Sequence, residues 1–238
     1  MTSALPFKLT DDRPPQIGLI VLSEDETVEM DFRRLVPQEF ELFVSRVPSG
    51  AEVLPETLSA MEAHIGTAAA LFPRSSRFAA VGYACTSGAA QIGSSQVATL
   101  ISSAVETRAV TNPLTALVSA CHASGVRRLG MLSPYVAEVS RRIQDVLSEE
   151  GISTTAFGSF EVSEEARVAR ISGASLLAAA KAVADMGEVD ALFLSCTNLR
   201  TLDVLPELEE AIGLPVFSSN QVLAWDLLRA AESGFVSA

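Results

Sequence analysis

Two cysteines stand at matching places in this chain, each at the end of an apolar run and each followed by small polar residues. Cys85 follows the run 78–84, and Cys196 follows the run 191–195. A thiol at the end of a buried strand can act as a nucleophile or carry a proton. Two such thiols facing each other could act on one small substrate from opposite sides. We therefore predict Cys85 and Cys196 as catalytic residues.

The residues behind each cysteine carry groups that suit this chemistry. Thr86, Ser87 and Gly88 follow the first cysteine, and Thr197 and Asn198 follow the second. A free thiol ionises near pH 8.5, and backbone N–H groups at a helix start lower that value. The hydroxyl and amide groups can hold a substrate carboxylate, and the glycine allows close approach to the backbone. We predict all five as substrate-binding residues.

Tyr135 is the next candidate, because it comes soon after the apolar run 128–132. Its hydroxyl can hold a carboxylate or donate a proton. Cys121 lies in the middle of an apolar helical pattern and is predicted to be a core residue, while His64 and His122 are predicted at the surface of helices. Neither a metal-ligand spacing nor a glycine-rich nucleotide loop is present in the sequence, so we predict neither a metal site nor nucleotide binding.

The pattern around the cysteines occurs twice. The two cysteines are 111 positions apart, and the apolar segments 17–21 and 129–132 begin 112 positions apart. Agreement of this kind indicates two similar halves rather than a short repeat. We predict a first α/β half from residues 1–112 with 221–238, and a second from residues 113–220.

Short apolar runs alternate with helical patterns along the whole chain. Strands are expected at 17–22, 40–47, 78–84, 109–110, 128–132, 153–160, 191–195 and 215–217. Helices are expected at 57–71, 94–105, 113–125, 135–150, 175–186, 206–212 and 221–231. This alternation predicts an α/β fold of mostly parallel sheet flanked by helices. Ligands bind beyond the carboxyl ends of such strands, which is where both cysteines fall.

The composition and net charge of the chain limit the classes of molecule that it can bind. The chain has 238 residues, of which 48% are hydrophobic and 19% charged, and a formal net charge of −12. This acidic balance disfavours nucleic acids and anionic membranes as partners, since both require basic surface. No export signal and no apolar run of about 18 residues is present. We expect a cytoplasmic protein with reduced thiols. The sequence is compatible with either a monomer or a homo-oligomer.

Four segments carry a resemblance to a known family: 17–21, 85–88, 133–135 and 195–198. On these residues the chain resembles the aspartate/glutamate racemase superfamily, in the branch with maleate cis–trans isomerases and arylmalonate decarboxylases. Its closest likeness, through residues 31–34 and 45–50, is to proteins of bacterial ectoine-utilisation clusters.

The resemblance implies two pseudo-symmetric α/β halves with the active site between them. It also implies cofactor-free catalysis by the two cysteines, with Cys85 as nucleophile and Tyr135 holding a carboxylate. Arylmalonate decarboxylases keep only the second cysteine, so the presence of Cys85 points away from them.

The chain departs from the maleate isomerases at two positions. Asparagines that bind carboxylates in that family would fall near Asp25 and Glu165 here. An ionised carboxylate repels a second substrate carboxylate and attracts an ammonium group. The alternative is that both acids face solvent at helix N-termini, where negative charge is stabilising.

These observations predict a cofactor-independent two-cysteine isomerase, similar to maleate isomerase, acting on a small carboxylic acid. A racemase of amino acids or diamino acids, using the cysteines as paired acid and base, is one alternative. An arylmalonate-type decarboxylase and a non-catalytic metabolite-binding protein are the others.

Overall fold

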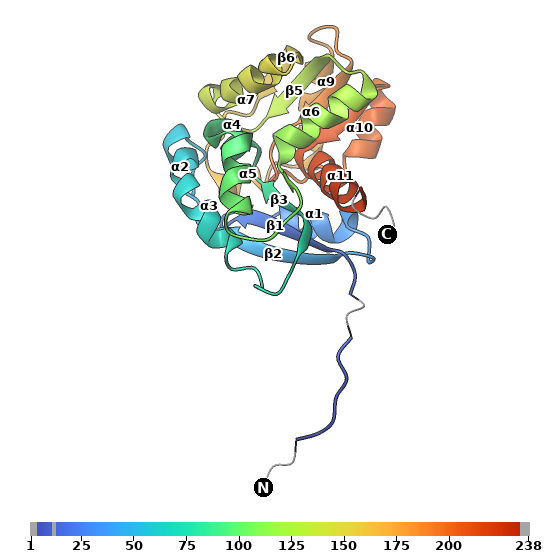
Figure 1. Ribbon diagram of the computed structural model, residues 1–238. Helices are drawn as coiled ribbons and strands as arrows, with labels where there is room; N and C mark the ends of the chain where they lie inside the picture. The colour runs from blue at the N-terminus through green and yellow to red at the C-terminus, as the bar shows by residue number, and fades with distance from the viewer. Residues whose placement is uncertain (1–3, 11–12, 234–238) are drawn as a thin grey trace.

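Two four-stranded parallel sheets form the framework of the protein (Figure 1). The computed structural model describes residues 4–10 and 13–233. The strand order is β2-β1-β3-β4 in the first sheet and β6-β5-β7-β8 in the second, so each strand has a counterpart four places later. The strands are β1 (Gln16–Leu22), β2 (Glu41–Val47), β3 (Phe78–Ala84), β4 (Val110–Thr111), β5 (Arg128–Ser133), β6 (Ser153–Ser159), β7 (Ala191–Leu194) and β8 (Val216–Ser218).

Helices follow most strands and cover the faces of the sheets. They are α1 (Val28–Leu35), α2 (Pro55–Ala60), α3 (Glu62–Ala69), α4 (Thr86–Ile92), α5 (Ser94–Ser102), α6 (Pro113–Ser124), α7 (Ala137–Glu149), α8 (Glu165–Val168), α9 (Gly173–Ala184), α10 (Leu205–Ile212) and α11 (Ser219–Glu232). The predicted helix at 57–71 is two helices, α2 and α3, and α1, α4 and α8 were not predicted.

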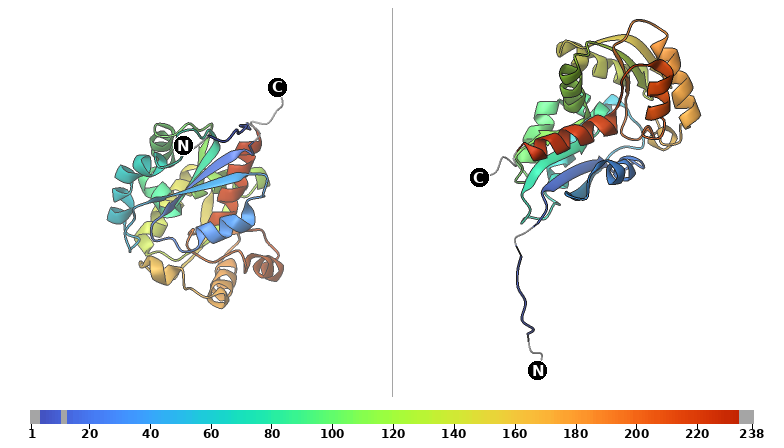
Figure 2. Two further views of the ribbon diagram at one scale, coloured as in Figure 1. Left: turned by 90° about the horizontal axis from the view of Figure 1, so that it is seen from below. Right: turned by 90° about the vertical axis from the view of Figure 1, so that its right-hand side faces the viewer.

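The alternation of side chains along β1 explains how the first sheet is buried on both faces. All seven residues of β1 are buried. Ile17 and Leu19 pack in one apolar cluster with Phe32 of α1 and Leu223 of α11, whereas Ile20 belongs to the larger core on the opposite face. Successive residues of a strand point to opposite faces, so a continuous apolar run is required here. Figure 2 shows α11 lying along the first sheet.

The sheet register places the site-forming loops side by side. Val21 of β1 pairs with Ala84 of β3, and Leu132 of β5 pairs with Leu194 of β7. The loop after β1 therefore begins beside the first cysteine, and the loop after β5 begins beside the second.

The fold prediction of two mostly parallel α/β halves is confirmed. The chain boundaries at residues 112 and 220 stay a proposal, because α11 packs against α1 and β3 of the first half and also against α6 of the second.

Candidate active site

Cys85 and Cys196 come to one buried site from equivalent strands. Cys85 follows the last residue of β3, and Cys196 lies two residues after β7, which holds the same place in the second sheet. Each cysteine is 3% exposed. The hydroxyl of Tyr135, which is also buried, hydrogen-bonds the Cys196 thiol and interacts electrostatically with Cys85. The three side chains thus share one environment, as the sequence predicted.

The turn after β3 is built around the first thiol. Cys85 is the N-cap of α4, and its Sγ accepts a hydrogen bond from the Gly88 N–H at 3.1 Å. The Ser87 hydroxyl lies 3.7 Å from the same sulfur. A Cβ at Gly88 would lie 2.9 Å from this Sγ and 2.8 Å from the Tyr83 hydroxyl. Only glycine lets the backbone approach the thiol this closely.

The second thiol sits on an unusual backbone. Cys196 has a φ of 114°, a region that side chains other than glycine rarely adopt. Its N–H donates to the Ser219 hydroxyl at 2.9 Å, and its Sγ accepts from the Asn198 N–H at 3.3 Å. The Ser219 hydroxyl in turn lies 2.8 Å from that of Thr86. Backbone and thiol are therefore both held in place.

Asp25 connects the two halves through Thr197, the residue after Cys196. Its Oδ1 accepts hydrogen bonds from the N–H groups of Thr27 and Val28, both at 2.8 Å, as at the start of a helix. Its Oδ2 accepts from the Thr197 hydroxyl, also at 2.8 Å. Asp25 is buried, and burial raises the pKa of its carboxyl although these hydrogen bonds act in the opposite direction.

Asn198 contacts Glu165 within the second half and Glu26 of the first half. The Asn198 Nδ2 donates to Oε2 of Glu165 at 2.8 Å, and the Asn198 Oδ1 accepts from the Glu26 N–H at 2.9 Å. Glu165 is 5% exposed, and burial raises the pKa of its carboxyl to about 7. The expectation that Asp25 and Glu165 face solvent is wrong, because both carboxyls are enclosed where the halves meet. The Asn198 amide is occupied within the protein on both sides.

The electrostatics of the site keep both thiols protonated. Burial raises the pKa of Cys85 to about 12, with a smaller opposing effect from the Gly88 N–H. Burial also raises the pKa of Cys196 well above its usual value, and the charges of Glu165 and Asp25 add to this. Two carboxyls beside two thiols disfavour a thiolate. A positive charge entering the site, or protonation of a carboxyl, would favour one.

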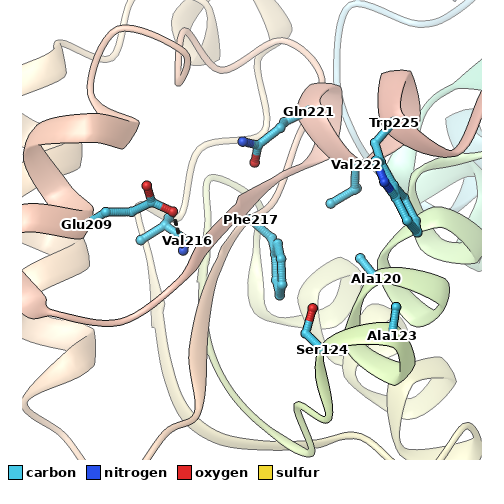
Figure 3. Close-up of a pocket in the computed structure, with 9 residues that line it drawn as sticks. All are labelled: Ala120, Ala123, Ser124, Glu209, Val216, Phe217, Gln221, Val222 and Trp225. Carbon is cyan, nitrogen blue, oxygen red and sulfur yellow. Dashed lines mark hydrogen bonds between the residues drawn. The ribbon is translucent and has the colours of Figure 1, made fainter. Parts of the chain in front are cut away.

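The site is closed to solvent. All ten predicted site residues are buried. The two cysteines, Tyr135, both carboxylic acids and the polar residues after the cysteines are each at most 5% exposed, and Gly88 is buried in α4. A cavity of about 290 Å³ lies elsewhere, beside α11, where Gln221, Val222 and Trp225 line it together with Phe217 (Figure 3). None of the predicted site residues lines this cavity. For a substrate to reach the thiols, we expect segments that cover the cysteines to separate.

Three polar residues near Cys196 were missed by the sequence analysis. Ser219 and Asn220 open α11, and the Asn220 Nδ2 donates to the Thr197 carbonyl at 2.8 Å and to Asp31 Oδ2 at 2.7 Å. Burial raises the pKa of Asp31 to about 6. Asn220 was not among the predicted site residues. Its position just after a predicted strand, where ligands bind in such sheets, was the signal available.

The remaining chemistry-bearing residues lie where the sequence placed them. Cys121 is fully buried in α6, and His64 and His122 are exposed. Within residues 4–10 and 13–233, no three His, Cys, Asp or Glu side chains gather as metal ligands would. None of the helices in those ranges is long and apolar enough to cross a membrane.

Comparison with known proteins agrees with this geometry. Residues 18–238 match the family described as arylmalonate decarboxylase. The chain belongs to the arylmalonate decarboxylase family. This confirms the predicted branch of the superfamily and the prediction that the chain is an enzyme.

The similar proteins include maleate isomerases and an arylmalonate decarboxylase. A maleate isomerase of Nocardia farcinica is 28% identical over 90% of this chain and 89% of its own. An arylmalonate decarboxylase of Bordetella bronchiseptica is 34% identical, over half of each chain. Among solved structures, a cysteine-to-serine mutant of the Nocardia farcinica maleate cis–trans isomerase, with a covalently bound succinylcysteine intermediate, superimposes with a TM-score of 0.79. It is 26% identical and covers 92% of this chain and 94% of its own. The relatives support the isomerase class.

Proposed function

We propose that this protein is a cofactor-independent isomerase acting on a small carboxylic acid, with Cys85 and Cys196 as its catalytic pair. The observation that carries the proposal is the pair of buried thiols at the ends of equivalent strands, both beside the Tyr135 hydroxyl. The covalent succinylcysteine in the related maleate isomerase supports nucleophilic chemistry by a thiol on this fold.

A cis-alkene diacid would react in three steps. The Cys85 thiolate adds to one alkene carbon, and the Cys196 thiol protonates the other carbon. The new C–C single bond then rotates. Finally the Cys196 thiolate removes the proton, the electron pair restores the double bond and the Cys85 thiolate leaves as the trans product forms. Tyr135, Ser87 and the N–H groups behind the cysteines would stabilise the enolate-like charge.

The attacking thiolate must first be generated, since both thiols are held protonated at neutral pH. We propose Glu165 as the acceptor of this proton. Its carboxyl acts electrostatically on both cysteines and has a pKa of about 7, near the pH at which a general base works best.

An amino-acid or diamino-acid racemase is the second candidate, and the burial of Asp25 and Glu165 favours it. The side-chain hydrogen bonds to these carboxyls come from Thr197 and Asn198, both neutral. The Arg46 guanidinium already acts on the Asp25 carboxyl, and a substrate ammonium would add further positive charge and lower the pKa of both thiols. One cysteine would then remove the α-proton while the other delivers a proton to the opposite face. Arylmalonate-type decarboxylation, suggested by the family name, stays a further alternative.

The test is a substrate panel in heavy water, followed by NMR. It includes cis and trans dicarboxylates, both enantiomers of amino and diamino acids, and arylmalonates. Cis–trans conversion supports the isomerase, α-deuteration with loss of optical activity supports the racemase, and carbon dioxide release supports the decarboxylase. No reaction of any compound would contradict the proposal and indicate a metabolite-binding protein.

Cysteine variants separate the two leading mechanisms. In a cis–trans isomerase, Cys85→Ala abolishes turnover. In a racemase, Cys85→Ala and Cys196→Ala each still exchange the α-proton of one enantiomer. Cys121→Ala is the matched control, because Cys121 is buried in α6 and takes no part in the site.

A further inference from the structure

One hydroxyl from α11 connects the two cysteine turns. Ser219 is fully buried, and its Oγ accepts the hydrogen bond of the Cys196 N–H at 2.9 Å. The same Oγ lies 2.8 Å from the hydroxyl of Thr86, the residue directly after Cys85. A single side chain, from outside both cysteine turns, therefore links the backbone of one proposed catalytic residue to the neighbour of the other.

The Cys196 backbone needs such support. Its φ of 114° is disfavoured for a residue with a side chain, and such conformations persist only where neighbouring groups fix them. Ser219 binds the N–H on one side of Cys196. Asn220, the next residue of α11, donates to the carbonyl of Thr197 on the other side at 2.8 Å. The first turn of α11 thus holds the strained segment at both ends.

Ser219 is not required to cap its own helix. That role belongs to Ser218, whose Oγ accepts a hydrogen bond from the Gln221 N–H at 3.3 Å. Both serines are fully buried and adjacent in sequence. The Ser218 hydroxyl caps α11, and the Ser219 hydroxyl contacts the two cysteine turns. This contrast provides a matched pair of variants.

We propose that Ser219 is a positioning residue: its hydroxyl fixes the direction in which the Cys196 thiol projects and sets its placement relative to Cys85. The consequence for catalysis rests on the proposed function above, whereas the consequence for the Cys196 backbone does not. The two are tested separately.

The backbone test uses selective ¹⁵N-cysteine labelling, because the chain has three cysteines and so three cysteine amide signals. Ser219→Ala leaves the Cys196 N–H without its acceptor. We expect its signal to shift and its hydrogen exchange to become at least about tenfold faster, which corresponds to the loss of one hydrogen bond. The Cys121 amide is an internal reference, since it lies within α6. Ser218→Ala should lower the melting temperature but leave the Cys196 amide unchanged.

The catalytic test uses a substrate identified by the panel. Ser219→Ala should lower kcat about tenfold or more while KM changes less than about threefold, because the thiol is misdirected but binding groups stay. Ser218→Ala should keep the wild-type kcat. The double variant Ser219→Ala with Thr86→Val should be no slower than the slower single variant, because the hydroxyl pair acts as a unit.

The outcomes distinguish the two proposals. An unchanged Cys196 amide in Ser219→Ala, or an equal change in Ser218→Ala, overturns the positioning role whatever the activity. A wild-type kcat in Ser219→Ala also overturns it. If the wild-type protein turns over nothing in the panel, the proposed function fails, and the amide measurement still decides whether Ser219 holds Cys196.

Discussion

Glu165 carries a carboxyl group that is 5% exposed and acts electrostatically on both cysteine thiols. Burial raises its pKa to about 7, so near neutral pH the group can exchange a proton with its surroundings. Ionised, it suits a substrate ammonium. Protonated, it can donate a hydrogen bond to a carboxylate. The charge of Glu165, like that of Asp25, therefore bears on the choice between the two candidate functions.

The raised pKa of Glu165 predicts a pH dependence of stability. Its folded-state pKa, about 7, lies above the ordinary value of 4.5, so the protonated carboxyl favours the folded state. The free energy of unfolding should fall as pH rises between these two values, by up to about 3 kcal/mol for this group. Glu165→Gln should reduce this change, as measured by urea unfolding at pH 5 and pH 8, and leave the part due to Asp25 and Asp31, whose pKa values burial also raises. An equally steep change in Glu165→Gln would show that the carboxyl is not held protonated.

Gly88 gives a second prediction. A Cβ there would lie 2.9 Å from the Cys85 Sγ, so Gly88→Ala must displace the thiol or the turn. We expect a loss of about 1–3 kcal/mol in the free energy of unfolding and a large loss of turnover. Gly66→Ala is the control, because its Cβ would lie 3.7 Å from the nearest atom, in a helix. Equal behaviour of the two variants in denaturation and activity assays would refute the close-approach argument.

Residue types and spacing were enough to predict which side chains meet at the site, but not how they are used. Cys85, Cys196 and Tyr135 lie together as predicted, since each follows an apolar strand. The burial of Asp25 and Glu165 could not be predicted, because it depends on contacts between segments more than a hundred residues apart, Thr197 with Asp25 and Glu165 with Ala51. The role of Ser219 depends on the angle at which α11 meets both cysteine turns.

A short antiparallel pairing between the halves holds the Glu165 backbone. The Glu165 N–H donates to the Ala51 carbonyl at 2.9 Å, and the Val53 N–H donates to the Ser163 carbonyl at 2.7 Å. A bridge between Glu52 and Glu164 lies between these bonds. The pairing joins the segment after β2 to the segment before α8. Its separation would move Glu165 and open the closed site.

Hydrogen exchange tests this element directly. We expect the amides of Val53 and Glu165 to exchange faster than those of Leu19 in β1, because two hydrogen bonds separate more readily than a buried sheet. A bound substrate should slow the exchange of the pairing and leave β1 unchanged. Exchange at Val53 as slow as at Leu19 would contradict opening at this place and require another route of entry.

Strands and long helices, which have a regular apolar pattern, were predicted better than short helices. The strands of both sheets were expected within a few residues, because buried parallel strands are continuous apolar runs. Helices α1, α4 and α8 were not expected, since they have four to eight residues and too few turns for an apolar period. Of these, α4 matters most for the site, because Cys85 is its N-cap.

The whole molecule carries a formal net charge of −12, and its site contains two buried carboxyls. Long-range repulsion therefore opposes the approach of a dianionic substrate, and salt screens this repulsion. Raising salt from about 0.01 M to about 0.2 M should increase kcat/KM for a dicarboxylate and change it less than about twofold for a zwitterionic amino acid. A fall in kcat/KM for the dicarboxylate would mean that local donors outweigh the overall charge.

The equivalence of the two sheets explains why a duplication in the sequence yields a single site. Strands β3 and β7 hold the same position in sheets of the same order, so the segments that follow them meet where the halves join. The hydrogen bonds from Thr197 to Asp25 and from Cys196 to Ser219 cross this junction or lie beside it. Neither half alone contains both thiols.

The most direct test of the account is cross-linking of the two thiols with 1,3-dibromoacetone, which needs no knowledge of the substrate. Each thiol displaces one bromide, so a single three-carbon bridge should join Cys85 to Cys196, identified by mass spectrometry of the digested protein, with Cys121 unmodified. Separate adducts on Cys85 and Cys196 without a bridge, or a bridge that includes Cys121, would show that the two sulfurs do not face a common substrate.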